Sequence, residues 1–208
     1  MEVNRANNKV KFGLSNVHYA LVTETVATTG SNAGQVETTY GSLKALAGAV
    51  SMSLSSSASK SVFRADNSDY YISYGEGGFS GSLEVARVNE GFLKDIFGYK
   101  QDNDNILVQD SASFQQTQYF ALVFEFSGDQ GAQKHCLYKC SADPIDLASQ
   151  TTGEGGSTDP QTETLNITVV PRADADKYIH LQTQDTTSTA VTAAWYTAVP
   201  VPTFTPSP

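Results

Sequence analysis

Histidine and cysteine are the residues of this sequence best suited to bind a metal ion, and they are few. His18, His135 and His180 each lie in a segment with the alternating pattern of a β-strand. Cys136 follows His135, and neighbouring residues of a strand point to opposite faces, so these two side chains cannot bind the same ion. The sequence has no His-Glu-x-x-His or Cys-x-x-Cys spacing. We therefore expect no metal site and no cofactor.

The two cysteines, Cys136 and Cys140, fall in one strand-like segment, and alternation places both on the same face as Tyr138. Four residue steps along a strand separate two Cα atoms by ~13 Å, whereas a disulfide requires ~7 Å or less. We expect free thiols in a chain made in a reducing cytoplasm.

An acidic segment, Asp102-Asn-Asp-Asn105, begins like a calcium-binding loop. The positions at which that loop needs its next oxygen ligand and a glycine hold Ile106 and Leu107 instead. The segment therefore predicts a turn stabilised by Asp and Asn side chains.

Serine, glycine and paired carboxylates also occur without the neighbours that catalysis requires. The serines at 51–59 lack a Gly-x-Ser-x-Gly elbow. The glycine clusters at 75–78 and 153–156 lack the lysine of a phosphate-binding loop. Asp143 and Asp146 flank a proline in a loop, where nothing would separate their pKa values into an acid and a base. We therefore expect no enzyme activity.

Short alternating segments separated by turn residues predict an all-β dominated fold. Strands are expected at 9–24, 49–54, 70–74, 80–88, 119–126, 135–142, 165–169 and 195–199. The segment 119–126 is apolar on both faces, which predicts a central strand covered on both sides. The glycines at 75–78 predict a hairpin connection between the strands beside them, and 55–61 a flexible, serine-rich stretch.

The segment 89–98 instead predicts one short helix, which Asn89 would cap at its start and Gly98 at its end. Its apolar face would hold Phe92, Leu93, Ile96 and Phe97. Residues 1–199 are expected to form a single domain, followed by a proline-rich tail or arm at 200–208.

Charge is unevenly distributed along the 208 residues, whose formal net charge is −9. Residues 1–65 hold six basic and three acidic side chains, and the remaining residues hold seven basic and nineteen acidic ones. Tight binding of nucleic acid requires lysine and arginine, so this balance argues against it. The charged fraction of 17% suits either a surface covered by neighbouring subunits or an ordinary β domain. No segment has the apolar run of a secretory signal or a membrane helix.

Several segments together, in this order, resemble the major tail proteins (tail tube proteins) of long, flexible-tailed bacteriophages. The segments are 13–20, 48–55, 65–71, 78–88, 92–99, 120–140, 160–172 and 195–199. The resemblance implies a β-sandwich or partly closed barrel flanked by the helix, without an additional immunoglobulin-like domain. It also implies homohexameric rings that stack into the tube through which DNA leaves the capsid.

The same resemblance implies a virion tail protein, assembled in the host cytoplasm with a tape-measure protein and tail-end proteins, with no membrane contact. Phage DNA would pass through without specific binding. Acidic residues that could face the lumen are Glu76, Glu84, Asp102, Asp104 and Glu125. Candidate contacts between rings lie in loops and at chain ends, at Asn8, Thr29, Gly30, Ser57, Gly153, Gly155 and Pro200.

A monomeric β-sandwich that binds carbohydrate or acts as an adhesin is the alternative function. Tyr70, Tyr71 and Tyr74 could stack on sugar rings. Strict alternation, however, would place Tyr70 and Tyr71 on opposite faces. A protein that remains monomeric at high concentration would favour this alternative.

Overall fold

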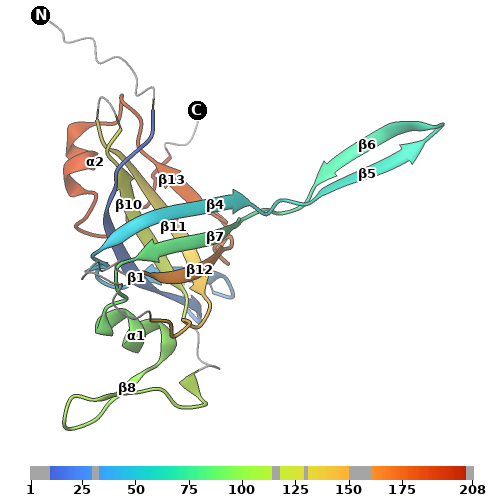
Figure 1. Cartoon of the computed structure of the whole chain (residues 1–208). Helices are drawn as coiled ribbons and strands as arrows, with labels where there is room; N and C mark the ends of the chain where they lie inside the picture. Colours follow the sequence, from blue (N-terminus) through green and yellow to red (C-terminus); the bar gives the residue numbers. More distant parts are fainter. Residues whose placement is uncertain (1–9, 30–32, 114–117, 129–130, 150–160, 205–208) are drawn as a thin grey trace, which may run out of the picture.

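The computed structural model describes residues 10–29, 33–113, 118–128, 131–149 and 161–204 (Figure 1). Strands account for most of the regular structure in these ranges, as the alternating segments predict. In chain order the strands are β1 (Leu14–Val26), β2 (Val36–Tyr40), β3 (Lys44–Ala45), β4 (Ala49–Ser56), β5 (Lys60–Ala65), β6 (Ser68–Tyr74), β7 (Phe79–Val85), β8 (Lys100–Gln101), β9 (Leu107–Val108), β10 (Phe120–Phe126), β11 (Gln133–Ala142), β12 (Glu163–Val169) and β13 (His180–Gln182). The helices in these ranges are α1 (Glu90–Phe97) and α2 (Thr189–Ala194).

Nine strands form one antiparallel sheet. Seven follow the order β2-β1-β10-β11-β12-β7-β4, while β13 pairs with β11 and β3 pairs with β1. The sheet curls around its apolar face (Figure 1), and β3 returns the chain to β1 just before β4 begins. Within the described ranges no ladder joins β4 to β1, so β2 and β4 remain the edges of an unclosed barrel. The predicted β-dominated fold is confirmed, with two helices rather than one.

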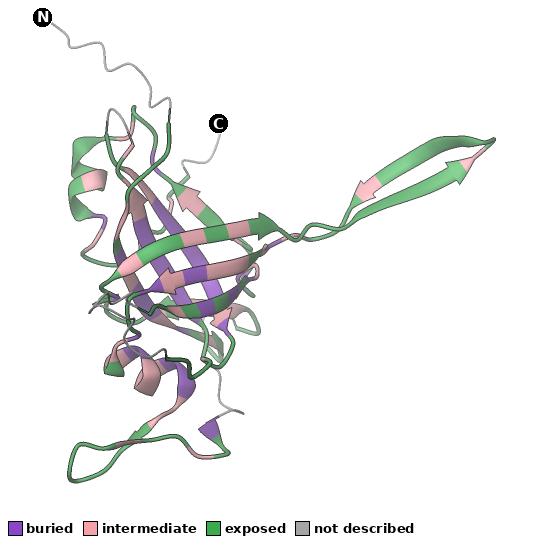
Figure 2. Cartoon of the chain, viewed as in Figure 1, coloured by how far each residue is buried: buried purple, intermediate pink, exposed green. Residues whose placement is uncertain are grey.

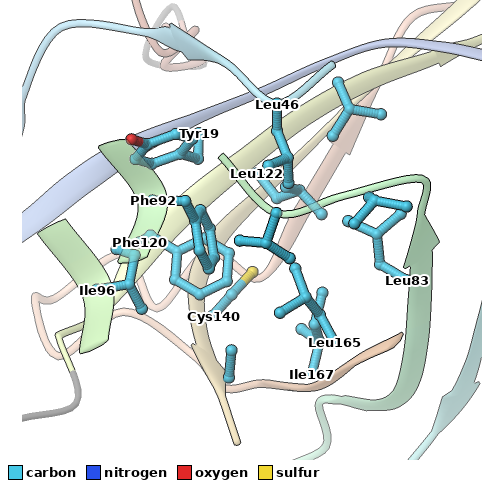
Figure 3. Close-up of a cluster of buried hydrophobic side chains, with 14 of the residues drawn as sticks. Tyr19, Leu46, Leu83, Phe92, Ile96, Phe120, Leu122, Cys140, Leu165 and Ile167 are labelled. Atoms are coloured by element: carbon cyan, nitrogen blue, oxygen red, sulfur yellow. The ribbon is translucent and has the colours of Figure 1, made fainter. Parts of the chain in front are cut away.

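The β10 strand is covered on both faces, as predicted. Phe120 and Leu122 (Figure 3) belong, together with Phe124, to the larger apolar cluster inside the curled sheet. Ala121 and Val123 belong to a second cluster on the opposite face, which the segment after α2 covers. All five side chains are at most 3% exposed, so β10 is an interior strand of the sheet, paired with β1 and β11 and covered on both faces.

The α1 helix closes one end of the larger cluster (Figure 3). Asn89 caps it by accepting a hydrogen bond from the Phe92 amide at 2.8 Å, and Gly98 ends it with a left-handed φ of 68°. The Phe92 ring packs edge-on against Tyr19 at 4.9 Å and against Phe120 at 5.2 Å. Each fully buried ring of this kind stabilises the fold by ~1.5–3 kcal/mol, which holds an eight-residue helix that would be marginal alone.

The predicted hairpin connection at 75–78 is wrong. The β6 strand pairs with β5, and β7 pairs with β4 and β12. The glycine segment instead continues the ladder between these pairs, because Gly75 donates to the Ser59 carbonyl at 2.9 Å and Ser57 donates to the Gly78 carbonyl at 3.0 Å. The predicted flexible stretch at 55–61 is therefore one side of a long hairpin.

The turn of this hairpin is Asp66–Asn67. Ala65 and Ser68 are paired across it, so the turn contains two residues. Both of its residues have positive φ, at 51° and 64°, which is the backbone of the turn favoured between two twisted strands. Asp and Asn tolerate this region better than most residues, and that property explains the position of the turn.

The predicted final strand at 195–199 is also wrong. The α2 helix, capped by Ser188, ends at Ala194, and Trp195 follows it in helical conformation, so the segment forms a turn after the helix rather than a strand. Trp195 and Val199 are buried against the second cluster. Alanines and a serine cap favour a helix before the tryptophan, and burial of the indole fixes it.

The prediction that Cys136 and Cys140 share a face is wrong as well, although both thiols are buried and free. Cys136 lies in the second cluster, and Cys140 lies in the larger one. The register with β10 shifts between the pairs Phe120–Cys140 and Leu122–Leu137, so β11 contains an extra residue. Such a bulge reverses the side of every residue beyond it.

Candidate functional site

Two of the three histidines meet in the folded chain. The pairing of β11 with β13 brings His135 Nδ1 to 3.0 Å from His180 Nε2. His135 stacks between the rings of His180 and Phe124, and burial, followed by the charge of His180, lowers its pKa to about 4. His18 lies elsewhere, bonded to the Asn16 carbonyl. Among the described residues no third ligand completes a metal site with the pair.

The Asp102–Asn105 segment forms the predicted turn, between β8 and β9. Asp102 Oδ1 accepts hydrogen bonds from the amides of Asp104 and Ile106 at 3.0 and 2.7 Å. These bonds stabilise the turn through one oxygen of the Asp102 carboxylate, as predicted for a turn of Asp and Asn residues. Asp143 and Asp146 are exposed in the loop after β11, and the glycines at 153–156 lie outside the described residues.

A two-stranded ribbon provides a different kind of candidate site, a contact surface. We call β5 and β6 together the aromatic ribbon. It projects from the body of the protein (Figure 1) and is exposed along both strands (Figure 2). In the described chain each strand pairs only with the other, so both outer edges have free backbone groups. The ribbon exposes Val62, Phe63, Tyr70, Tyr71, Ile72 and Tyr74.

A register shift groups the aromatic side chains near the tip. Phe63 pairs with Tyr71, and Arg64 pairs with Asp69, so Tyr70 is the extra residue of a bulge. The Tyr70 ring lies 6.5 Å from the Phe63 ring. Strict alternation, which separates Tyr70 from Tyr71, is therefore wrong here, because both tyrosines lie beside Phe63.

This aromatic group does not form the flat platform on which a sugar ring stacks. The Phe63 and Tyr70 rings meet edge-on at 82°. Tyr71 is 62% exposed and Tyr70 is 72% exposed. An isolated two-stranded ribbon is marginal in water, and this one has neither a third strand nor a covering layer within the described chain. Its exposed rings and free edges suit burial against another protein chain.

Two of the proposed lumen residues lie in or near β7: Glu76 lies near the root of the ribbon, and Glu84 lies on the outer face of β7. Glu76 forms an ion pair with Lys177 at 2.6 Å, and the hydrogen bond from that lysine lowers the Glu76 pKa. Glu84 accepts hydrogen bonds from Thr162 and Ser51, which lower its pKa. Both carboxylates are therefore charged at neutral pH and held by neighbours.

The other three lie apart from these. Glu125 is half-buried and accepts hydrogen bonds from Asn16 and from the Tyr196 hydroxyl, and burial followed by the Glu125 charge raises the Tyr196 pKa. Asp102 and Asp104 are exposed on the β8–β9 hairpin. Apart from Asp102 and Asp104, which share one turn, the proposed lumen carboxylates lie in different segments, and the fold of one subunit does not gather all five on a single strand or loop.

Of the seven residues proposed as contacts between rings, three lie in the described part of the chain. Asn8, Gly30, Gly153 and Gly155 lie outside the described residues. Thr29 is exposed in the loop between β1 and β2, and Ser57 is exposed at the root of the ribbon. Pro200 is half-buried, and its carbonyl accepts a hydrogen bond from Tyr138 at 2.8 Å, so the segment from residue 200 begins docked on the second cluster.

Sequence reasoning missed the ribbon as a unit because it predicted no strand at 60–65 and paired the strand at 70–74 with the strand that follows it. The available signal was the pair Asp66–Asn67 between two segments of β-forming residues.

Among the described residues, neither helix combines the length and apolar character needed to cross a bilayer. The chain matches no model in a scan of protein families and no protein in a search of curated proteins.

Proposed function

We propose that this protein is a structural subunit that self-assembles into stacked homohexameric rings, forming a phage tail tube. The observation that supports this most is the aromatic ribbon, whose exposed rings and unpaired edges have no partner in the described part of its own chain. The order of segments that resemble tail tube proteins gives the proposal its specific identity.

The ribbon belongs to a contact that joins different surfaces of two copies. Such a head-to-tail contact closes into a ring or continues as a filament, depending on the rotation between the copies. The outer edges of β2 and β4, which are unpaired within the described ranges, are suited to contacts within a ring, where pairing would occupy them. Stable contacts of this kind bury more than ~1,000 Å² in total.

The net charge of −9 per chain fits a tube that DNA crosses without binding. Phosphates are repelled by carboxylates, and few lysines or arginines are available to hold them. Tape-measure and tail-end proteins would be the partners inside and at the ends of the tube, and the site of action would be the virion tail.

Electron microscopy of the purified protein tests the proposal. Negatively stained samples should contain rings or tubes with sixfold symmetry at high protein concentration. A protein that stays monomeric at every concentration would refute the proposal and favour a binding module.

A ribbon-less chain provides the matched control. Lys60–Tyr74 is replaced by Asn-Gly, a pair that favours a tight hairpin turn. Ser59 and Gly75 already share a backbone hydrogen bond at 2.9 Å, so the shortened hairpin can close. We expect a circular dichroism spectrum that is still dominated by β-structure, a cooperative thermal unfolding transition and the loss of stacked tubes. Tubes of normal length from this variant would show that the ribbon has no part in assembly.

A further inference from the structure

A cavity at one end of the curled sheet matches the tip of the ribbon in chemistry. It has a volume of about 420 Å³, within the range of sites that hold a small ligand or a few side chains. Residues from β4, β7, β10, β11 and β13 line it. We call it the β13 pocket. The apolar side chains that line it are Met52, Leu54, Phe79, Phe124, Phe126 and Leu137.

Aromatic rings form one wall of the β13 pocket. Phe124, His135 and His180 are stacked in series, with 5.2 and 5.3 Å between successive ring centroids and 11° between their planes. His135 is buried, while His180 is exposed at the end of the stack. Phe79 meets His180 edge-on at 6.1 Å. A further aromatic ring placed beside His180 would extend this stack by offset or edge contacts.

Charge at the mouth of the pocket complements the tip of the ribbon. Lys11 lines the pocket, is exposed and forms no ion pair within the described residues. Asp66, in the turn of the ribbon, is likewise exposed and outside the ion pairs of the described chain. Tyr70 and Phe63 lie next to that turn.

The ribbon cannot fill the β13 pocket of its own chain. The pocket is lined by residues 52–54, which immediately precede the root of the ribbon. From Ser57 to Ala65 the ribbon extends eight residue steps, or ~26 Å, away from that root. Figure 1 shows it pointing away from the body of the sheet. Only a second copy can therefore bring a ribbon tip to this pocket.

We propose that the β13 pocket of one copy receives the aromatic ribbon tip of the next copy, with Asp66 facing Lys11 and Tyr70 packing beside His180. This inference rests on the proposed self-assembly and specifies its receiving surface. Because donor and acceptor are different surfaces, each copy can both give and receive a ribbon, and the contact continues along the tube axis.

Two complementary variants test the proposal in the full-length chain. The ribbon-less chain keeps the pocket, and a Met52→Trp chain keeps the ribbon but fills the pocket with an indole. Neither should form stacked tubes alone. When the two variants are mixed in equal amounts, the ribbon of the Met52→Trp chain should bind the open pocket of the ribbon-less chain. No further copy can then be added through a ribbon, so mass photometry should show complexes with one ribbon contact per pair of chains. Circular dichroism and thermal unfolding verify that both variants are folded.

A charge exchange tests the contact without filling the cavity. Lys11→Glu in the ribbon-less chain should weaken the binding of that chain to the Met52→Trp chain about threefold to tenfold. Asp66→Lys, added to the Met52→Trp chain, should restore the binding between the two chains. Replacing His180 with Ala should weaken binding, whereas His180→Phe, which keeps an aromatic ring, should preserve it. Arg87→Glu, after β7, makes the same change of charge at an exposed residue outside the pocket, so it is the matched control for Lys11→Glu and should leave binding unchanged.

The outcomes separate this inference from the proposed function. If the wild-type chain never assembles, the proposed function fails. If the wild-type chain forms tubes and the Met52→Trp chain forms them equally well, the β13 pocket is not the receptor, although the proposed function remains. Failure of Asp66→Lys to restore binding to the Lys11→Glu chain would also overturn the inference, because the ribbon tip would then dock elsewhere.

Discussion

Replacing Phe63 with Ala should impair assembly while leaving the folded subunit almost unchanged. In the free chain the Phe63 side chain is 61% exposed, so its removal leaves no core cavity. A fully buried aromatic side chain removes ~150–250 Å² from water. Burial of the exposed part in a contact would therefore cover about 90–150 Å², which stabilises the contact by about 2–4 kcal/mol.

This free energy corresponds to an association constant about 40- to 600-fold lower for Phe63→Ala. The critical concentration for tube formation, measured by sedimentation and light scattering, should rise by a comparable factor. The free energy of unfolding of the monomer, measured by urea titration, should change by less than ~0.5 kcal/mol, as for surface substitutions generally.

Two control variants bracket this result. Phe120 is fully buried, so Phe120→Ala should lower the free energy of unfolding by about 3–5 kcal/mol. Val191, on α2, is 48% exposed, and Val191→Ala should alter neither folding nor assembly. An unchanged critical concentration for Phe63→Ala would refute the argument that the exposed ribbon is buried between subunits.

Three further predictions concern the folded subunit. Lys139 is only 8% exposed and forms an ion pair with Glu24 at 2.5 Å. Glu24→Leu should lower the free energy of unfolding by about 3–5 kcal/mol in urea titrations, because it removes the partner of this buried lysine. Adding Lys139→Met should recover most of this loss; an equal loss in the double variant would contradict the role of the unpaired charge. His135 has a pKa of about 4 in the folded chain, below its ordinary value of 6.5. Between these two pH values the unfolded chain binds a proton at His135 that the folded chain does not bind. The free energy of unfolding should therefore fall by about 3 kcal/mol as the pH is lowered from 6.5 to 4. His135→Phe should remove that part of the decline in unfolding curves recorded across this range, and an identical pH dependence in both proteins would refute the assignment. Asn89→Ala should cost about 1 kcal/mol by removing the cap of α1, and an unchanged thermal midpoint would show that the cap is dispensable.

Local sequence pattern was sufficient where each residue's environment depends on near neighbours. Asn89, the apolar face around Phe92, and Gly98 predicted α1 because capping and helical spacing act over a few residues. The doubly apolar segment 119–126 predicted the central β10 strand for a similar reason, since a strand that is apolar on both sides must be covered on both sides.

Patterns failed where pairing or an extra residue decided the outcome. Bulges moved Cys140 to the opposite face from Cys136 and placed Tyr70 beside Tyr71, because one inserted residue reverses alternation. Trp195 belongs to an alternating segment, yet burial after α2 fixed it in helical conformation.

The sequence by itself determined the β-dominated class, the α1 helix and the doubly covered β10 strand, because hydrophobic spacing and capping are local. Only the tertiary structure decided that β5 and β6 form a projecting ribbon and that His135 and His180 meet at a pocket. Those features depend on which distant strands share hydrogen bonds. Alternation along one strand specifies its two faces, but it contains no information about the strand that will lie beside it.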